Sequence, residues 1–154
     1  MSDRSGVITL NSPLGPLTVR EKNGAIAAVD FAAATEQRET PLLAAAKVQL
    51  DAYFYCGLKS FELPLAAVGS DFNRRVWAVI AAIPYGHTLT YGEVAARVGG
   101  DARSVGGACG ANRIPIIIPC HRVVGQGGTM VGYSGAGGPE TKRFLLQLEG
   151  ALLL

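Results

Sequence analysis

The sequence predicts an α+β fold, within the broad α/β class, made of two domains. Residues 1–69 are expected to form a small β-meander with one helix, and residues 70–154 a mostly helical, winged-helix-like domain with a helix-turn-helix. Turn residues divide the first third of the chain into short apolar runs, as in a meander. After residue 70 the apolar residues recur at helical spacing. A short glycine-containing turn joins two of the expected helices, as in a helix-turn-helix.

The length and composition are those of a compact folded protein. The chain has 154 residues, 49% hydrophobic and 17% charged, which is enough for one sizeable core or two small ones. Its first ten residues lack the apolar segment of a secretory signal. We therefore expect a cytoplasmic protein whose three cysteines, Cys56, Cys109 and Cys120, are reduced thiols.

Turn and helix signals define the elements of the first domain. Asn23-Gly24 stands between two apolar runs and predicts a hairpin turn. Apolar residues recur at helical spacing from Pro41 to Tyr55, and Gly57 can adopt the left-handed conformation that ends a helix. The expected elements are strands at 6–10, 17–20 and 25–31, a helix at 41–55 and an extended segment at 61–65.

The second domain begins with a helix start signal. Gly69-Ser70-Asp71 predicts a linker that runs into a helix cap, and Pro84-Tyr85-Gly86 ends the helix that follows. Gly99-Gly100-Asp101 supplies a tight turn and a cap between two short helices, the layout of a helix-turn-helix. The expected helices cover residues 72–83, 91–98, 102–109 and 139–148.

Gly106 and Gly107 lie inside the second helix of this motif. Each costs about 1 kcal/mol of helix propensity relative to alanine, so that a close approach to the helix backbone is expected. The approaching group is either another helix or a nucleic-acid backbone, in which case Arg103 would reach into the duplex. Residues 71–154 carry eight Lys/Arg against five Asp/Glu, but an ordinary solvated surface explains this excess better than phosphate contacts do.

Residues 117–123, Ile-Ile-Pro-Cys-His-Arg-Val, carry the chemistry of the chain. We expect the end of a buried strand here. Because packing alone does not require Cys-His-Arg at the end of a strand, the segment indicates a reactive site. A base or cation beside a thiol raises the fraction of thiolate, the nucleophilic form. Adjacent side chains of an extended backbone point to opposite faces, so Cys120 and His121 need a turn or a bridging water to interact.

An imidazole base needs an orienting partner, and Glu149 is the candidate. A carboxylate at the end of a helix opposes the macrodipole, so Glu149 either faces solvent or pairs with a buried group. Cys56 and Cys109 fall in helical patterns and are expected to be inert core residues. The histidines and cysteines lack zinc-site spacing and no phosphate-binding loop is present, so we expect no metal and no cofactor.

The sequence resembles the 6-O-alkylguanine-DNA alkyltransferases, also called methylated-DNA–protein-cysteine methyltransferases. Residues 119–123, Pro-Cys-His-Arg-Val, match the active-site signature of that family, and the similarity covers nearly all of residues 71–154. Residues 12–15 are similar to its more variable N-terminal domain. The matching segments are 72–77, 83–86, 90–95, 103–107, Asn112, 133–135 and 145–149.

The resemblance implies a repair protein that flips an alkylated guanine out of the duplex and transfers the alkyl group irreversibly to Cys120, once per molecule. His121 would be a water-mediated base oriented by Glu149, and Asn112 would hold the active-site turn. Arg103 would fill the gap left by the flipped nucleotide, in the minor groove. The implied base-binding residues are Tyr91, Val124, Tyr133 and Ser134, and the implied DNA-binding residues are Arg103, Ser104, Gly106, Gly107 and Ala108.

Two features depart from the family pattern. Arg113 stands where proline is usual, and the Gly135–Pro139 segment is longer. The N-terminal half also lacks the cysteine and histidine ligands of a structural zinc site found in some relatives.

The expected partner is double-stranded DNA with an alkylated guanine, bound by a monomer, and cooperativity along DNA is left open. Three other functions also remain open: a damage-binding alkyltransferase-like protein that does not react, a cysteine hydrolase that turns over, and a sequence-specific helix-turn-helix regulator.

Overall fold

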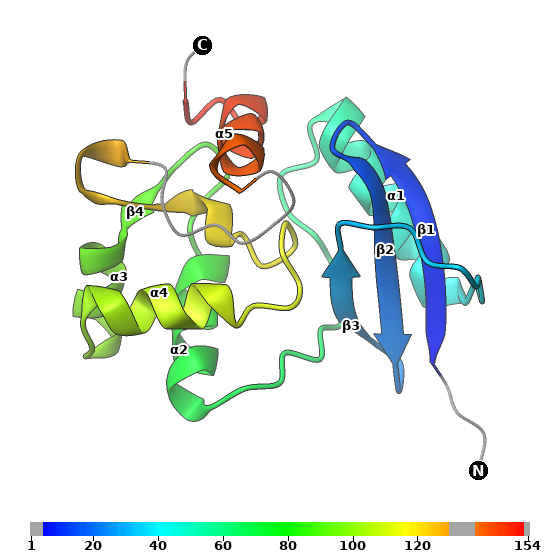
Figure 1. The fold of residues 1–154 in the computed structure, drawn as a ribbon, viewed down its shortest axis with the longest axis horizontal. Helices are drawn as coiled ribbons and strands as arrows, with labels where there is room; N and C mark the ends of the chain where they lie inside the picture. The colour runs from blue at the N-terminus through cyan, green and yellow to red at the C-terminus, as the bar shows by residue number, and fades with distance from the viewer. Residues whose placement is uncertain (1–4, 130–137, 153–154) are drawn as a thin grey trace. The chain divides into compact units, whose positions relative to one another are not determined.

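The computed structural model describes residues 5–129 and 138–152, and the chain forms two compact units, Met1–Ala67 and Val68–Leu154 (Figure 1). An antiparallel sheet in the first unit and a set of helices in the second confirm the predicted α+β class. No helix of the described residues is long and apolar enough to cross a membrane. The first unit contains β1 (Gly6–Ser12), β2 (Gly15–Lys22), β3 (Ala25–Asp30) and α1 (Pro41–Cys56).

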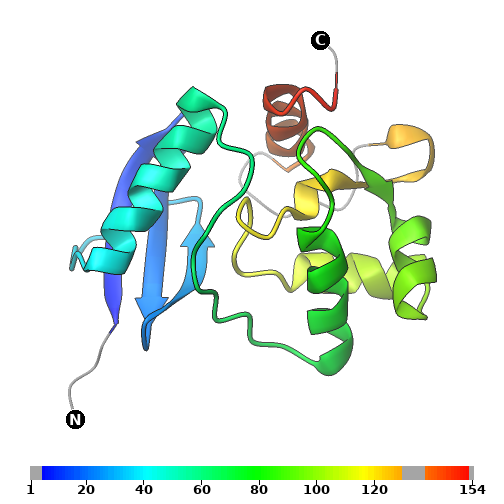
Figure 2. The same ribbon diagram turned by 180° about the vertical axis from the view of Figure 1, so that it is seen from behind.

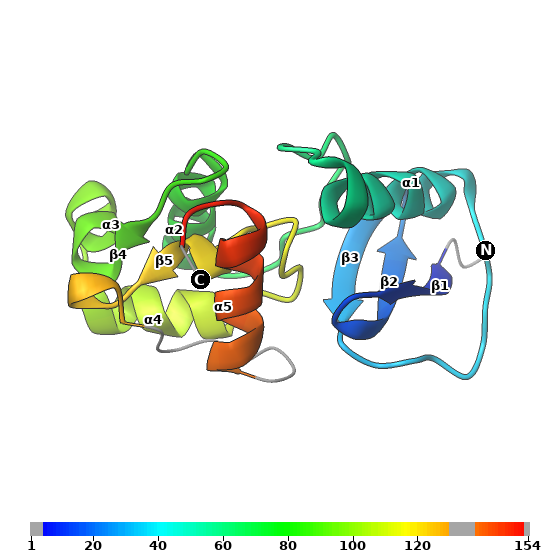
Figure 3. The same ribbon diagram turned by 90° about the horizontal axis from the view of Figure 1, so that it is seen from above.

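The three strands form a meander in the order β1-β2-β3. The predicted hairpin turn joins β2 to β3, where Asn23 and Gly24 both have positive φ, 53° and 80°, as a two-residue turn of this kind requires. Helix α1 covers one face of the sheet (Figure 3). The core between them is apolar and fully buried, and includes Leu17, Val19, Ile26, Leu43, Ala46 and Leu50.

The second unit contains the predicted helix-turn-helix. Gly99, with a φ of 78°, ends the first of its helices, and Asp101 caps the second by accepting a hydrogen bond from the Ser104 N–H at 2.8 Å. The elements of this unit are α2 (Asp71–Ala81), β4 (Leu89–Thr90), α3 (Tyr91–Val98), α4 (Ala102–Gly110), η1 (Cys120–Arg122), β5 (Val123–Val124), η2 (Gln126–Gly128) and α5 (Pro139–Leu148).

Helix α2 supports the helix-turn-helix from one side. It packs against both α3 and α4, and Figure 2 shows it in front of α4. Val76 and Ile80 are fully buried in this contact. The Trp77 indole N–H donates to the carbonyl of Ala108 at 2.8 Å, so that the buried ring contributes both apolar area and a satisfied hydrogen bond.

The expected strand before Cys120 is wrong. Residues 114–118 form a buried turn in which the Ile118 N–H donates to the Ile114 carbonyl at 2.9 Å and Ile116 has a φ of 73°. Pro115 and Pro119 lack the N–H groups that a strand inside a sheet would donate, which explains the turn.

A pair of short parallel strands joins the two regions that matter most for the chemistry. Leu89 of β4 pairs with Val123 of β5, and Thr90 with Val124. The pairing places the start of α3, at Tyr91, beside the backbone that follows Cys120.

The start of α3 supplies a test of this arrangement. Thr90 Oγ1 accepts from the Glu93 N–H at 3.0 Å, while Glu93 Oε1 accepts from the Thr90 N–H at 2.8 Å, which is a capping box. Thr90→Ala removes the first bond and is expected to lower the free energy of unfolding by about 1 kcal/mol, measured by urea denaturation. Thr88→Ala, at an exposed position before the helix, is the control; an equal loss in both variants would contradict the capping role.

Candidate active site

Asn112 holds Cys120 at the end of the buried turn. Its Nδ2 donates to the Cys120 sulfur at 3.1 Å and to the Ile118 carbonyl at 3.0 Å. Its Oδ1 accepts from the Ile114 N–H at 2.9 Å. One side chain therefore binds both ends of the turn and the thiol itself. A donor directed at the sulfur also favours the thiolate over the thiol.

His121, Glu149 and Arg122 form a buried hydrogen-bond network. The distance from His121 Nε2 to Glu149 Oε2 is 2.7 Å. Arg122 donates from Nε to Glu149 Oε1 at 2.8 Å and from Nη2 to Oε2 at 3.0 Å. Glu149 is only 4% exposed, so the solvent-facing alternative for this residue is excluded. The carboxylate instead pairs with the buried imidazole of His121, which is the second of the two alternatives that the sequence left open for Glu149.

The network fixes the tautomer of His121. Burial lowers the pKa of this imidazole, against the opposing effect of its hydrogen bond to Glu149, so the ring is neutral near neutral pH. Because an ionised carboxylate only accepts, Nε2 carries the hydrogen and Nδ1 holds a free lone pair. Among the described residues, Nδ1 of His121 is the one buried side-chain nitrogen or oxygen without a hydrogen-bond partner. This nitrogen is available to accept a proton.

The Cys120 thiol is protonated at rest. The neighbouring Cys109 thiol and burial both raise its pKa, while Asn112 and the charge of Lys142 act in the opposite direction. Cys109 is buried as expected, and its thiol is close enough to Cys120 to affect the pKa of that thiol. Cys56 is exposed at the end of α1 and is not a core residue. Its helical pattern placed it correctly in a helix but not on the buried face.

A buried lysine completes the site, and sequence reasoning missed it. Lys142 on α5 is fully buried, and its Nζ donates to the Tyr91 hydroxyl at 3.3 Å and lies 5.4 Å from the centre of the Tyr91 ring. Burial lowers the pKa of Lys142 to about 8 and raises that of Tyr91 to about 12. Tyr91 is therefore a protonated phenol near neutral pH. The available signal was the helical spacing of Lys142 with the buried Leu145, Leu146 and Glu149.

The other predicted base-binding residues are placed only in part. Val124 on β5 is buried, two residues after η1. Tyr133 and Ser134 lie outside the described residues, as does the start of the longer segment from Gly135. Within the described residues, no three His, Cys, Asp or Glu side chains are grouped so that they could hold a metal ion.

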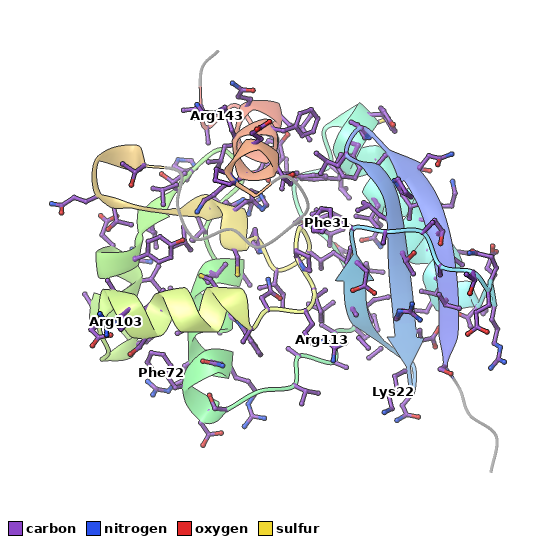
Figure 4. All side chains as sticks on the ribbon, viewed as in Figure 1. Lys22, Phe31, Phe72, Arg103, Arg113 and Arg143 are labelled. Atoms are coloured by element: carbon purple, nitrogen blue, oxygen red, sulfur yellow. The ribbon has the colours of Figure 1, made fainter. Side chains whose placement is uncertain are left out.

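Helix α4 presents an open surface of small residues. A Cβ atom built on Gly106 or on Gly107 would meet no atom of the described residues within 4 Å, so packing against one of the described helices does not explain these glycines. Arg103 and Ser104 are exposed on the first turn, and Figure 4 shows Arg103 at the start of the helix. Ala108, in contrast, is fully buried against α2 and does not belong to this open surface.

One unit thus combines a helix-turn-helix with a buried thiol and a buried imidazole that is hydrogen-bonded to a carboxylate. This combination is typical of a DNA-binding protein that reacts through a thiol. Residues 71–151 match the family model described as 6-O-methylguanine DNA methyltransferase, DNA binding domain. Residues 7–67 match that of the ribonuclease-like domain of the same methyltransferase. The chain belongs to the methylated-DNA–protein-cysteine methyltransferase family, as its signature implied, and is a DNA-binding enzyme of DNA repair.

Individual relatives agree over nearly the whole chain. The methylated-DNA–protein-cysteine methyltransferase of Methanosarcina acetivorans is 41% identical, over 91% of this chain and 95% of the relative. The constitutive enzyme of Bacillus subtilis is 40% identical, over 92% and 93%. The crystal structure of Mycobacterium tuberculosis OGT in complex with DNA has a TM-score of 0.82 and 41% identity, over 93% of this chain and 91% of that one.

The lowered pKa of Lys142 predicts a pH dependence of stability. Its folded pKa of about 8 lies below the ordinary value of 10.5, so between these values the unfolded chain binds a proton that the folded protein does not. Unfolding therefore becomes less favourable as pH rises through this window, by at most about 1.4 kcal/mol per pKa unit.

Urea denaturation from pH 7 to pH 10.5 measures this effect. Lys142→Met, which keeps the apolar stem, is expected to be the more stable protein relative to wild type at pH 7 and to lose that advantage as pH rises. Lys22→Met, at an exposed position on β2, is the control. Parallel stability curves for wild type and Lys142→Met would show that the lysine is not desolvated.

Proposed function

We propose that this protein reverses DNA damage directly, by flipping a 6-O-alkylated guanine out of the duplex and transferring its alkyl group irreversibly to Cys120. The observation that carries the proposal is a cluster of side chains in the helix-turn-helix unit, in which Cys120, His121 and Lys142 are buried and Tyr91 is half-buried. It contains a thiol, a neutral imidazole with a free Nδ1 and a phenol beside a lysine. Each step of an alkyl transfer from an aromatic ether has a matching group in this cluster.

The transfer begins with the Cys120 proton. His121 Nδ1 takes this proton through a bridging water, since no direct bond joins the two described side chains, and Glu149 stabilises the imidazolium that forms. The thiolate then attacks the alkyl carbon in line with the oxygen that leaves. A sulfur–carbon bond forms as the carbon–oxygen bond breaks, and the bonding electrons go to the guanine oxygen.

The guanine leaves as a neutral base if its ring receives a proton. Tyr91 is the donor we assign, because its pKa of about 12 keeps the phenol protonated until negative charge develops next to it. Lys142, with a pKa of about 8, lies beside the hydroxyl and can stabilise or reprotonate the phenolate. The product at Cys120 is a thioether, which has no acidic proton and is a poor leaving group, so each molecule acts once.

DNA is bound by α4 in the minor groove, in this proposal. Arg103 occupies the gap left by the flipped nucleotide, and Ser104, Gly106 and Gly107 follow the backbone next to it. The open space over both glycines supports a close approach by a partner that is not part of this chain. Tyr133 and Ser134 are proposed to contact the flipped base together with Val124. We expect the protein to bind as a monomer.

The acceptor is tested by intact mass after incubation with a duplex that contains 6-O-methylguanine. We expect one methyl gain per molecule, on the peptide that contains Cys120, and none in Cys120→Ala. Cys56→Ser, in the first unit, is the control and should accept one methyl. A protein that binds the damaged duplex without gaining mass would be a non-reacting damage sensor, and more than one product per molecule would indicate a hydrolase.

The DNA surface is tested at Gly107. Because a Cβ atom there meets no atom of the described residues within 4 Å, Gly107→Ala should stabilise α4 by up to about 1 kcal/mol, and Gly107→Leu should leave the fold intact. Binding to duplex DNA, measured by fluorescence anisotropy, should nevertheless weaken in both variants, and more in the leucine variant. Ala96→Leu, at an exposed position on α3, serves as the control. If Gly107→Leu binds duplex DNA with the affinity of wild type, α4 is not part of the DNA interface.

A further inference from the structure

Arg122, two residues after Cys120, is buried and held by hydrogen bonds to two partners. Two of its nitrogens donate to Glu149, as described above, and Nη1 donates to the Ile83 carbonyl at 2.7 Å. The guanidinium lies 5.8 Å from the centre of the Tyr85 ring. The segment before Pro84 thus holds one side of the guanidinium, while Glu149 holds the other. This anchoring leaves Arg122 few alternative positions.

The contact determines the charge of the Glu149–His121 pair. A guanidinium keeps its charge at every pH at which proteins fold and matches a carboxylate with two parallel hydrogen bonds. Both oxygens of Glu149 are bound by Arg122, and Oε2 also receives His121 Nε2. These donors favour the ionised carboxylate, and the guanidinium compensates its negative charge. The guanidinium therefore weakens the effect by which the Glu149 carboxylate would stabilise the doubly protonated ring of His121, the imidazolium.

We propose that Arg122 is a positioning residue that sets the lower pH limit of alkyl transfer, by orienting Glu149 and compensating its negative charge so that His121 stays neutral with Nδ1 free. The inference rests on the proposed function, because it concerns the base of that reaction. Arg122 acts only through Glu149 and His121 and does not touch the reacting atoms.

The charged groups around His121 give the sign of the effect. Burial, Arg122 and Lys142 lower the pKa of the imidazole, and Glu149 raises it. Cys120 precedes it in η1 as a neutral thiol at rest. Without the guanidinium, Glu149 is an uncompensated buried anion, and the imidazolium becomes the favoured form. A protonated ring cannot accept the thiol proton, so transfer should fail at a higher pH than in the native protein.

Single-turnover rates of methyl transfer, measured from about pH 5 to about pH 9 with excess protein, test this. For Arg122→Gln the acidic limb should move to higher pH, so that its rate relative to wild type falls roughly tenfold for each unit of displacement. Arg122→Lys keeps the charge and should keep the limb close to wild type, with a slower plateau because the paired hydrogen bonds are lost.

The matched control is Arg75→Gln. Arg75 also donates to a carbonyl, that of Val98 at 2.6 Å, and lies 5.6 Å from the Phe72 ring, but it binds no carboxylate in the described structure. Its variant should keep the native pH profile.

An acidic limb that coincides in Arg122→Gln and wild type would overturn the inference, as would an equal displacement in Arg75→Gln. If Arg122→Gln does not fold, Arg122→Lys carries the test. An acidic limb of Arg122→Lys displaced from that of wild type would then overturn the inference. Nitrogen NMR of native His121 gives a second readout: a ring protonated on Nδ1 near pH 7 contradicts the assigned tautomer. Wild type that gains no methyl at all would instead refute the proposed function.

Discussion

The ion pair between Glu149 and Arg122 is the interaction on which the rest of the site depends. It joins the residue that follows α5 to η1, and through Ile83 it reaches the end of α2. Removing one partner of a buried pair leaves an uncompensated charge, which costs about 3–5 kcal/mol, so these three elements hold one another in place. The imidazole that lies next to the thiol is oriented as a consequence. A site assembled in this way is rigid before any substrate arrives, and a preorganised site loses little energy to rearrangement during the reaction.

The sequence predicted those features that local chemistry determines. The helices and the helix-turn-helix could be predicted from capping residues such as Asp101, from the left-handed glycines at 57 and 99 and from the spacing of apolar residues. The meander could be predicted from the Asn23-Gly24 turn. Prediction failed for features that depend on contacts between residues far apart in the sequence. The run before Cys120 is apolar enough for a strand, but it contains two prolines, and none of the strands in the described part of the chain pairs with it. The burial of Lys142 and the contact between the Cys109 and Cys120 thiols arise only when α4, η1 and α5 pack together, and no pattern along the chain records that packing.

The glycines on the open surface of helix α4 lower the stability of the helix. Three glycines in nine residues, Gly106, Gly107 and Gly110, reduce its intrinsic helicity, and a Cβ on any of them would meet no described atom within 4 Å. The helix is stabilised instead by Asp101 at its start and by the packing of its buried face, which includes Val105 and Ala108, in a unit where α4 contacts α2 and α3. Stability on the buried face of α4 thus offsets what the open face gives up.

Asn112 lies two residues beyond the end of α4 and also binds the sulfur of Cys120. The distance between the helix surface and the thiol is therefore set by a short, internally bonded stretch of chain rather than by the packing of separate elements. The segment from Asn112 to Cys120 therefore fixes the distance between the surface of α4 and the Cys120 sulfur. An inserted or deleted residue in this segment would leave both the helix and the thiol chemically intact but would change that distance.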